Sequence, residues 1–311
     1  MRETLLPDQV AIQTRADLAP LEPAFAAALA VIRARHGLAS QTVSRADTGS
    51  SPVFLLDDCA VKIVPPQWKV ELDREVLALE AAHDKLTVRT PAVRATGTID
   101  AWTYMVSDRC AGVSLKVAGP SMDERSRRRV SAQVGEALAS LHNVSTSGLD
   151  ALACDWAEFA RARIASVQGF QRRTGLHESA VERIRAVLEE AAPLIVDERR
   201  ALIHGDLHHE HALVERDGDR WNLVGVLDFG DAMIGHPEYD LVTPAFFVAR
   251  TDRGALEAMF DAIGFVCDER SSRRLVAWSA LHQYNALARF LPADHGADAL
   301  DVIRTRYWPT A

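Results

Sequence analysis

The chain has 311 residues, a formal net charge of −8, and 48% hydrophobic and 25% charged residues. This length suffices for one large domain or for two lobes that share a cleft. The net negative charge disfavours a nucleic-acid partner, because the phosphate backbone would be repelled. The four cysteines lie far apart and form no C-x-x-C pair, which argues against a zinc ribbon and a disulfide framework.

The N-terminal region predicts a helix and carries no secretory signal. Residues 1–23 contain more acidic than basic side chains, and the apolar run Ala24–Ile32 is too short to span a bilayer. Apolar side chains recur at helical spacing and predict a helix over residues 20–36. These side chains are Leu21, Phe25, Leu29 and Ile32. We therefore expect a cytoplasmic protein that has no membrane partner.

A strand-rich stretch follows this helix. Short segments rich in β-branched and aromatic residues, bounded by turn residues, predict strands. The predicted strands are Gln41–Ala46, Pro52–Leu56, Cys59–Val64, Val93–Thr98 and Trp102–Val106. Pro65 and Pro66 end the third strand, because proline cannot donate to a sheet ladder. An amphipathic pattern over Val70–His83 predicts a helix between the third and fourth strands.

From Ser121 onward the pattern is mainly helical. Ser121 can cap a helix that extends to His142, with Asp123 and Glu124 in its first turn. Further helices are predicted near residues 155–168, 177–192, 253–263, 271–290 and 297–306. The change from strands to helices predicts an N-terminal lobe over residues 1–108 and a larger lobe over residues 109–311.

A non-helical segment, residues 201–231, interrupts the helical part and carries most of the chemistry. Its turn signal Asp217-Gly218-Asp219 predicts a hairpin that brings Asp206 and Asp228 side by side. Phosphoryl transfer needs one carboxylate that accepts the proton of the attacking hydroxyl and another that binds magnesium. We therefore assign Asp206 as the catalytic base and Asp228 as a metal ligand, with His211 as a second ligand or a support of the loop.

These motifs resemble the aminoglycoside phosphotransferase family, a branch of the protein-kinase-like fold. His204-Gly205-Asp206-x4-His211 is similar to the family's H-G-D-x4-N motif, and Asp228-Phe229-Gly230-Asp231-Ala232 to its metal motif. Gly235–Leu241 resembles its G-x-P-x-x-D-L segment, whose second acid, here Asp240, is structural. The resemblance implies an α+β, bilobal fold: a small lobe with an antiparallel sheet and a helix, and a larger, mainly helical lobe.

Histidine at position 211 departs from the family's usual asparagine. Imidazole nitrogen is a softer and poorer ligand for magnesium than an amide oxygen. Members similar to the aminoglycoside 2″-phosphotransferases carry histidine at this point, so the resemblance retains His211 as a metal ligand.

The resemblance also implies a nucleotide site in the N-terminal lobe. Lys62, in Ala60–Val64, would hold the α- and β-phosphates, with Glu75 as its ion-pair partner and Glu71 as the alternative. The segment Tyr104–Leu115 resembles the hinge between the lobes.

Three further nucleotide contacts are expected. The backbone of Asp108 and Cys110, within the hinge, would bond the base. Ser50, in the loop Asp47–Ser51, would cover the phosphates, an assignment that rests on position because the loop is not a G-x-G-x-x-G motif.

The resemblance implies a kinase that uses ATP or GTP with Mg²⁺ and phosphorylates a hydroxyl of a small, possibly cationic molecule, as a monomer or dimer. Asp228–Asp240 is too short for a platform that binds a peptide substrate. An aminoglycoside-like acceptor is the first expectation and implies antibiotic resistance. A metabolic kinase for an amino alcohol or sugar and a nucleotide-binding pseudokinase remain open, whereas a metallohydrolase lacks enough ligands.

Overall fold

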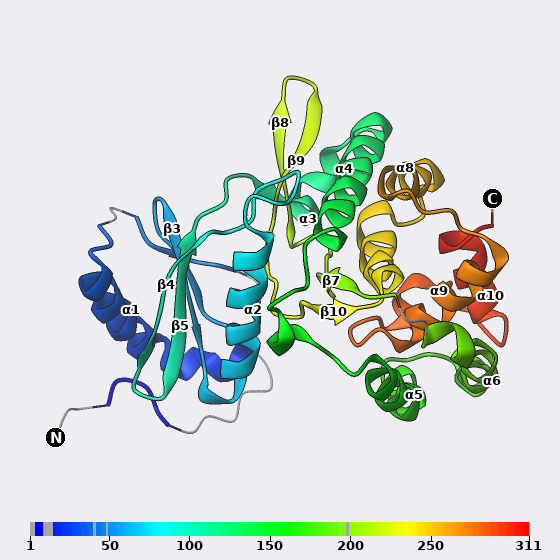
Figure 1. Ribbon diagram of the computed structural model, residues 1–311, viewed down its shortest axis with the longest axis horizontal. Coiled ribbons are helices and arrows are strands. Elements are labelled where there is room, and N and C mark those ends of the chain that lie inside the picture. Colours follow the sequence, from blue (N-terminus) through cyan, green and yellow to red (C-terminus); the bar gives the residue numbers. More distant parts are fainter. Residues whose placement is uncertain (1–3, 9–14, 40–41, 48, 197–198, 311) are drawn as a thin grey trace.

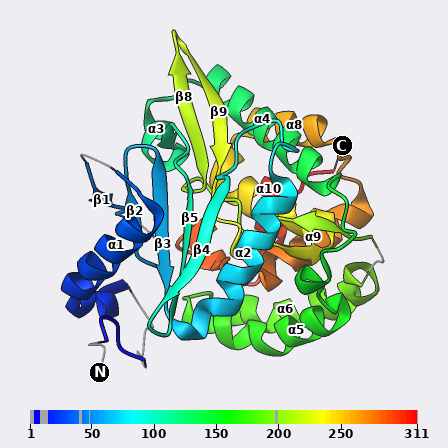
Figure 2. The ribbon, with the colours of Figure 1, turned by 60° about the vertical axis from the view of Figure 1, so that its left-hand side comes forward.

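An antiparallel sheet dominates the N-terminal third of the computed structural model, which describes residues 4–8, 15–39, 42–47, 49–196 and 199–310. In this described part the sheet has five strands in the order β1-β2-β3-β5-β4 (Figures 1 and 2). The strands are β1 (Ser44–Arg45), β2 (Val53–Leu55), β3 (Cys59–Val64), β4 (Val93–Ile99) and β5 (Trp102–Asp108). Of the predicted strand Gln41–Ala46, residue 41 lies outside the described residues.

Helices α1 (Glu22–His36) and α2 (Lys69–Ala82) pack on opposite faces of this sheet (Figure 1). Alternate strand residues face alternate sides. Val61 therefore points into the cluster that contains Phe25 of α1, whereas Lys62, paired with Met105 of β5, faces the side of α2. The charged side chain of β3 thus lies on the face that looks toward the rest of the molecule.

The remainder of the chain is mainly helical and holds two small antiparallel sheets (Figures 1 and 2). Its helices are α3 (Leu115–Ala118), α4 (Glu124–His142), α5 (Trp156–Arg173), α6 (Glu178–Ile195), α7 (Val242–Pro244), α8 (Arg253–Ile263), α9 (Glu269–Leu281) and α10 (Ala299–Tyr307). Its strands are β6 (Val113–Ser114), β7 (Ala201–Ile203), β8 (Ala212–Asp217), β9 (Arg220–Val226) and β10 (Met233–Gly235). The predicted combination of a sheet-rich part and a larger helical part is confirmed.

Short 3₁₀ or π turns complete the chain. They are η1 (Arg15–Leu21), η2 (Pro66–Trp68), η3 (Gly119–Ser121), η4 (Asp150–Leu152), η5 (Pro237–Leu241), η6 (Ala245–Ala249) and η7 (Leu287–Phe290). No helix among the described residues is both long and apolar enough to cross a membrane.

The hydrophobic core does not divide at residue 108, where the lobe boundary is predicted. Leu72 and Leu79 of α2 belong to the same buried cluster as Leu138 of α4 and Phe229. Burial of this shared apolar surface fixes α2 against the helical part, because each buried leucine contributes roughly 1.5–3 kcal/mol.

Several predicted helix ends are wrong, among them that of α5, which continues to Arg173 instead of ending near residue 168, and two others have a clear structural cause. The helix predicted over residues 271–290 ends at Leu281, because the buried side chain of Gln171 bonds the irregular backbone beyond it. Gln171 Nε2 donates to the carbonyl oxygens of Ala280 (3.1 Å) and Asn285 (2.9 Å), and its Oε1 accepts from Leu287 N–H. Asp123, rather than Ser121, caps α4, since its carboxylate accepts from the N–H of Ser126.

Candidate active site

The predicted hairpin is formed by β8 and β9. Ala212 pairs with Val226, and the two strands close at Asp217 and Arg220 around the turn Gly218-Asp219. Asp206 precedes the first strand and Asp228 follows the second. His211 contacts both segments: its Nδ1 lies 2.9 Å from the carbonyl oxygen of Asp206, and its Nε2 lies 3.4 Å from Asp228 Oδ2. The hairpin therefore brings the two acidic segments together around one imidazole.

The hydrogen bond of His211 fixes its tautomer. The Asp206 carbonyl can only accept, so Nδ1 must donate, and in the neutral ring Nε2 keeps a lone pair. That lone pair faces the carboxylate of Asp228, and two acceptors so close together repel unless a cation lies between them. The donor set of His211 and Asp228 thus fits a divalent metal ion.

Asp228 occupies an unusual backbone conformation and a charged environment. Its φ of 62° lies in the left-handed region, which is uncommon for a residue with a Cβ atom. Lys62 Nζ lies 3.2 Å from Asp228 Oδ1 and 2.7 Å from Glu75 Oε2. Burial alone would raise the pKa of Asp228, but the Lys62 ammonium holds it well below its ordinary value. The carboxylate is therefore ionised at neutral pH.

Lys62 is held by regular structure on both sides. It lies in the centre of β3, in register with Met105 of β5, and its ammonium reaches Glu75 of α2. Burial opposes its charge, but the carboxylates of Asp228 and Glu75 raise its pKa above the ordinary value. The expected pair of Lys62 and Glu75 forms, whereas Glu71 does not contribute an ion pair to Lys62 among the described residues.

Asp206 is buried and electrostatically suited to accept a proton. Its Oδ1 makes no hydrogen bond within the described residues. Burial, followed by the negative charges of Asp231 and Asp228, raises the pKa of Asp206 to about 8. The ionised carboxylate of a group with a raised pKa is a stronger base than that of an ordinary aspartate, which favours uptake of the proton of a hydroxyl. The free Oδ1 offers that hydroxyl an acceptor.

The backbone beneath Asp206 is fixed by Asp240. The two carboxylate oxygens of Asp240 accept from the N–H groups of His204 and Gly205, each at 2.9 Å, and His142 Nε2 lies 3.0 Å away. His204 in turn donates from Nε2 to the carbonyl of Leu227 at 3.0 Å. Asp240 and His204 therefore link the catalytic loop to the segment that carries Asp228.

Gly205 allows a close approach between those segments. Its φ is +80°, and a Cβ atom at this position would lie 2.5 Å from the carbonyl oxygen of Asp231. Any larger residue would push Asp206 away from the metal motif.

His208 lies close to Asp206 and His211, although the sequence motifs assign it no role. The ligand atoms of Asp206, His208 and His211 lie within 4.8 Å of one another. However, His208 Nδ1 accepts from the N–H of Glu210 at 3.1 Å, so its proton resides on Nε2, 3.7 Å from Asp206 Oδ2. Its ring stacks on His211. His208 thus presents a donor to Asp206, not a metal ligand.

Asp231 is engaged from the far side of the cleft. Its Oδ1 accepts from Gln283 Nε2 at 2.8 Å and from the Tyr284 hydroxyl at 3.1 Å. His282 Nε2 also lies 2.9 Å from the carbonyl of Gly205. No motif marks the segment 282–284, and only its position after α9 brings it to the catalytic loop.

The hinge carries the two expected base-binding residues. The N–H of Asp108 donates to the carbonyl of Ala92 at 2.8 Å and is therefore already paired within the sheet, so the contact of the Asp108 backbone with a nucleotide base stays a prediction. Cys110 follows at the edge of the helical part. Ser50 is exposed in the loop before β2. Among the described residues, no hydrogen bond or ion pair joins Ser50 to Lys62. The predicted role of Ser50 stays a prediction.

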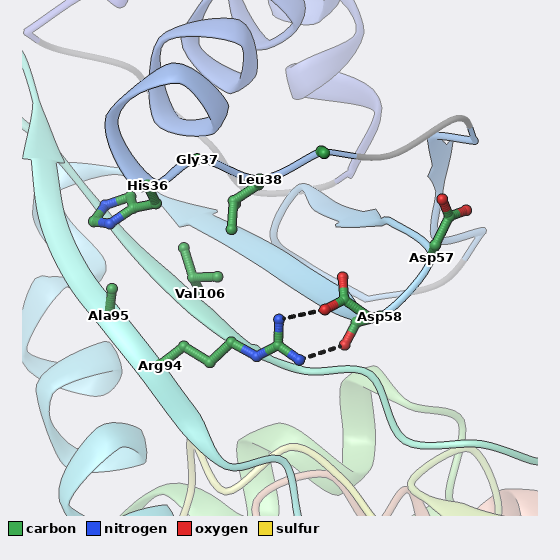
Figure 3. Close-up of a pocket in the computed structure, with 9 residues that line it drawn as sticks. His36, Gly37, Leu38, Asp57, Asp58, Arg94, Ala95 and Val106 are labelled. Carbon is green, nitrogen blue, oxygen red and sulfur yellow. Dashed lines mark hydrogen bonds and ion pairs between the residues drawn. The ribbon is translucent and has the colours of Figure 1, made fainter.

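A cavity of about 560 Å³ lies on the other face of the sheet (Figure 3). Val106 lines it, on the side of α1, so it does not communicate with Lys62. Arg94, at its wall, bonds Asp58 and also donates to Asp108 Oδ1 at 2.5 Å. This cavity is therefore separate from the cleft, although Arg94 braces the hinge.

Residues 31–276 match the APH family, described as the phosphotransferase enzyme family. This segment covers well over half of the chain, so the protein belongs to that family.

Solved structures of low sequence identity share the fold. The complex of APH(2″)-IIIa with GDP and kanamycin is 18% identical, with a TM-score of 0.71 over 90% of this chain and 98% of that one. The streptomycin–ATP complex of APH(2″)-IIa is 16% identical, with a TM-score of 0.61 over 88% and 98%. A macrolide 2′-phosphotransferase type I is 19% identical, with a TM-score of 0.59 over 97% and 100%. The protein-kinase-like fold expected from the sequence is confirmed.

Proposed function

We propose that this protein transfers the terminal phosphoryl group of ATP or GTP to a hydroxyl of a small molecule, with Mg²⁺ as cofactor. The observation that carries this proposal is the continuous contact from Glu75 through Lys62 and Asp228 to His211, next to Asp206. Membership of the phosphotransferase family supports it, as do similar structures that contain GDP or ATP. A cytoplasmic location, where nucleoside triphosphates are abundant, suits this activity.

Each residue of this chain has a role that follows from its charge. The Lys62 ammonium binds phosphate oxygens, and Glu75 holds it in place. Asp228 and His211 would hold Mg²⁺, which when bound neutralises charge on the phosphates. Asp206 orients the acceptor hydroxyl and takes its proton as the new oxygen–phosphorus bond forms and the bond to the leaving nucleoside diphosphate breaks.

The nucleotide base belongs at the hinge. The carbonyl of Asp108 and the backbone of Cys110 would bond its edge, and Ser50 would lie over the phosphates. The intact Lys62–Glu75 pair argues against a pseudokinase, since this ion pair is part of the catalytic arrangement of the kinase fold.

The decisive test is the variant Asp206→Asn. We expect a loss of about 10²–10⁴-fold in acceptor-stimulated release of ADP or GDP, because general-base assistance contributes this much. The assay screens aminoglycosides, amino alcohols and sugars in the presence of Mg²⁺. Asp219→Asn, at the exposed hairpin tip, is the matched control. Unchanged turnover in Asp206→Asn would remove Asp206 from the mechanism.

A further inference from the structure

A second cavity, of about 500 Å³, lies beside the acceptor side of the site. It is bounded by the end of α5 and by the irregular segment after α9. Six residues line it: Phe170, Thr174, Gln283, Tyr284, Ala286 and Arg289. Two of these, Gln283 and Tyr284, are the residues that bond Asp231.

The cavity is adjacent to the catalytic loop. The carbonyl oxygen of Asp231 approaches Gly205 so closely that a Cβ there would lie 2.5 Å away, and Asp206 is the next residue. Burial, then Asp231 and more weakly Asp206, raises the pKa of Tyr284, which places Tyr284 within the electrostatic reach of both acids. Tyr284 and Asp231 thus connect this cavity to the loop that carries Asp206.

The lining of the cavity contains no carboxylate. Its one ionic group is Arg289, which is exposed and makes no ion pair with any described residue. Asp231, which contacts two lining residues, already accepts two hydrogen bonds through Oδ1. A polycationic ligand would meet a guanidinium there instead of carboxylates.

A second arginine near the cavity also disfavours a polycationic ligand. Arg163 of α5 donates from Nε to the carbonyl of Leu281 at 2.8 Å, directly before this segment. Its Nη2 is buried and has no hydrogen-bond partner in the described part of the chain. Arg163 thus adds a second guanidinium beside this segment, and it makes no ion pair with any described residue.

We propose that the preferred acceptor is an alcohol with an apolar ring or chain and one anionic group, and not a polycation. This inference rests on the proposed function. Phe170, Ala286 and the ring of Tyr284 supply apolar contact for the body of such a molecule. Arg289 presents planar donors that match a carboxylate.

Three benzyl alcohols that differ only in their para substituent test the charge preference: carboxylate, carboxamide and aminomethyl. Kanamycin is the polycationic comparison. We expect kcat/KM and calorimetric affinity to rank the carboxylate first and the aminomethyl compound last of the three, with about a tenfold span, since one hydrogen bond to a charged group contributes roughly that factor. Kanamycin should be poorer than the carboxylate.

Arg289→Glu should reverse this order. Arg270→Glu is the matched control: it is the same charge change at an exposed residue near the start of α9, about 17 Å along the helix from its end, and it should leave the order unchanged. Circular dichroism confirms that both variants fold.

Preference for the aminomethyl compound or kanamycin, an order that Arg289→Glu leaves unchanged, or no binding of any of the three compounds would each overturn the inference. Failure of the proposed function gives a different result: no phosphorylation of any acceptor and no effect of Asp206→Asn. If the calorimetric order and its reversal still hold in that case, the charge preference of the cavity stands without the reaction.

Discussion

The nucleotide side and the acceptor side of the cleft are built in different ways. On the nucleotide side, Lys62 lies within β3 and Glu75 within α2, and their ion pair joins two regular elements. On the acceptor side, Gln283 and Tyr284 lie in an irregular segment after α9. Gln171 holds that segment by side-chain bonds to its backbone.

Because of this difference, the residues that bind the nucleotide and the residues that select the acceptor lie in separate parts of the structure. Binding of a triphosphate makes the same demands for every acceptor, so fixed charges on rigid elements are suited to it. Irregular segments on a rigid scaffold can change their side chains without disturbing the core. The comparison therefore predicts that substitutions on the two sides affect different kinetic constants.

The largest effect is expected for Lys62→Met. Loss of the ammonium removes the cation that stabilises the phosphates and leaves Glu75 and Asp228 unpaired. We expect kcat/KM for the nucleotide to fall by about 10²–10³-fold, comparable with removal of one preorganised donor. Steady-state kinetics measure this loss. Calorimetric acceptor affinity should stay within a few-fold, which also shows that the variant folds.

Lys69→Met is the control for that variant. Lys69 is an exposed lysine at the start of α2 whose partner is Asp73, and its removal should be nearly silent. Equal losses in Lys62→Met and Lys69→Met would contradict the assignment of the nucleotide side.

An intermediate effect, on stability, is expected for Asp240→Asn. Asp240 holds the backbone of the catalytic loop, which lies between the nucleotide side and the acceptor side. The change disturbs buried charged hydrogen bonds to His204 and Gly205 and should lower the free energy of unfolding by about 3 kcal/mol at pH 7. Urea denaturation measures it. Asp261→Asn, exposed on α8, is the control.

The stability difference at Asp240 should depend on pH. Burial would raise the pKa of Asp240, but the hydrogen bond and charge of His142 hold it below the ordinary value of 3.8. The folded state therefore binds this proton less readily than the unfolded state. The stabilisation is complete above pH 3.8 and is lost as the pH falls through the lower folded value. A difference that grows on acidification would be inconsistent with this account.

The smallest effect is expected for Gln283→Ala. Loss of its bond to Asp231 should raise the KM for the acceptor by roughly three- to tenfold, the value of one hydrogen bond, while the KM for the nucleotide stays the same. Gln168→Ala, which removes a bond from α5 to the Val181 carbonyl of α6, is the control. Parallel changes in both KM values would show that the two sides are coupled.

The parts of the site that lie close together in sequence could be predicted. A hairpin of six- and seven-residue strands leaves little freedom for Asp206 and Asp228, so their proximity follows from the turn signal. Lys62 was recognisable because a lysine in an apolar strand needs a buried partner. The family's motifs then indicated Glu75, although Glu71 lies only one turn away.

Features that depend on distant side chains could not be predicted. Apolar residues continue through Leu287 and Phe290, so periodicity alone extends the helix after Leu281. The break depends on Gln171, which lies on another helix. The contact of Tyr284 with Asp231 arises only because that break turns the segment toward the catalytic loop. The tautomer of His211 could not be predicted either, because it depends on the hydrogen bond from its Nδ1 to the carbonyl oxygen of Asp206, which only the structure shows.

At Asp228, the left-handed backbone conformation costs stability, whereas the side chain serves as a proposed metal ligand. Glycine would adopt a φ of 62° without the strain of about 1–3 kcal/mol that a side chain introduces. Glycine at this position would relieve that strain, but it would also remove the carboxylate that pairs with Lys62 and discard a metal ligand. Improved variants of this chain need to be scored for turnover as well as for melting temperature.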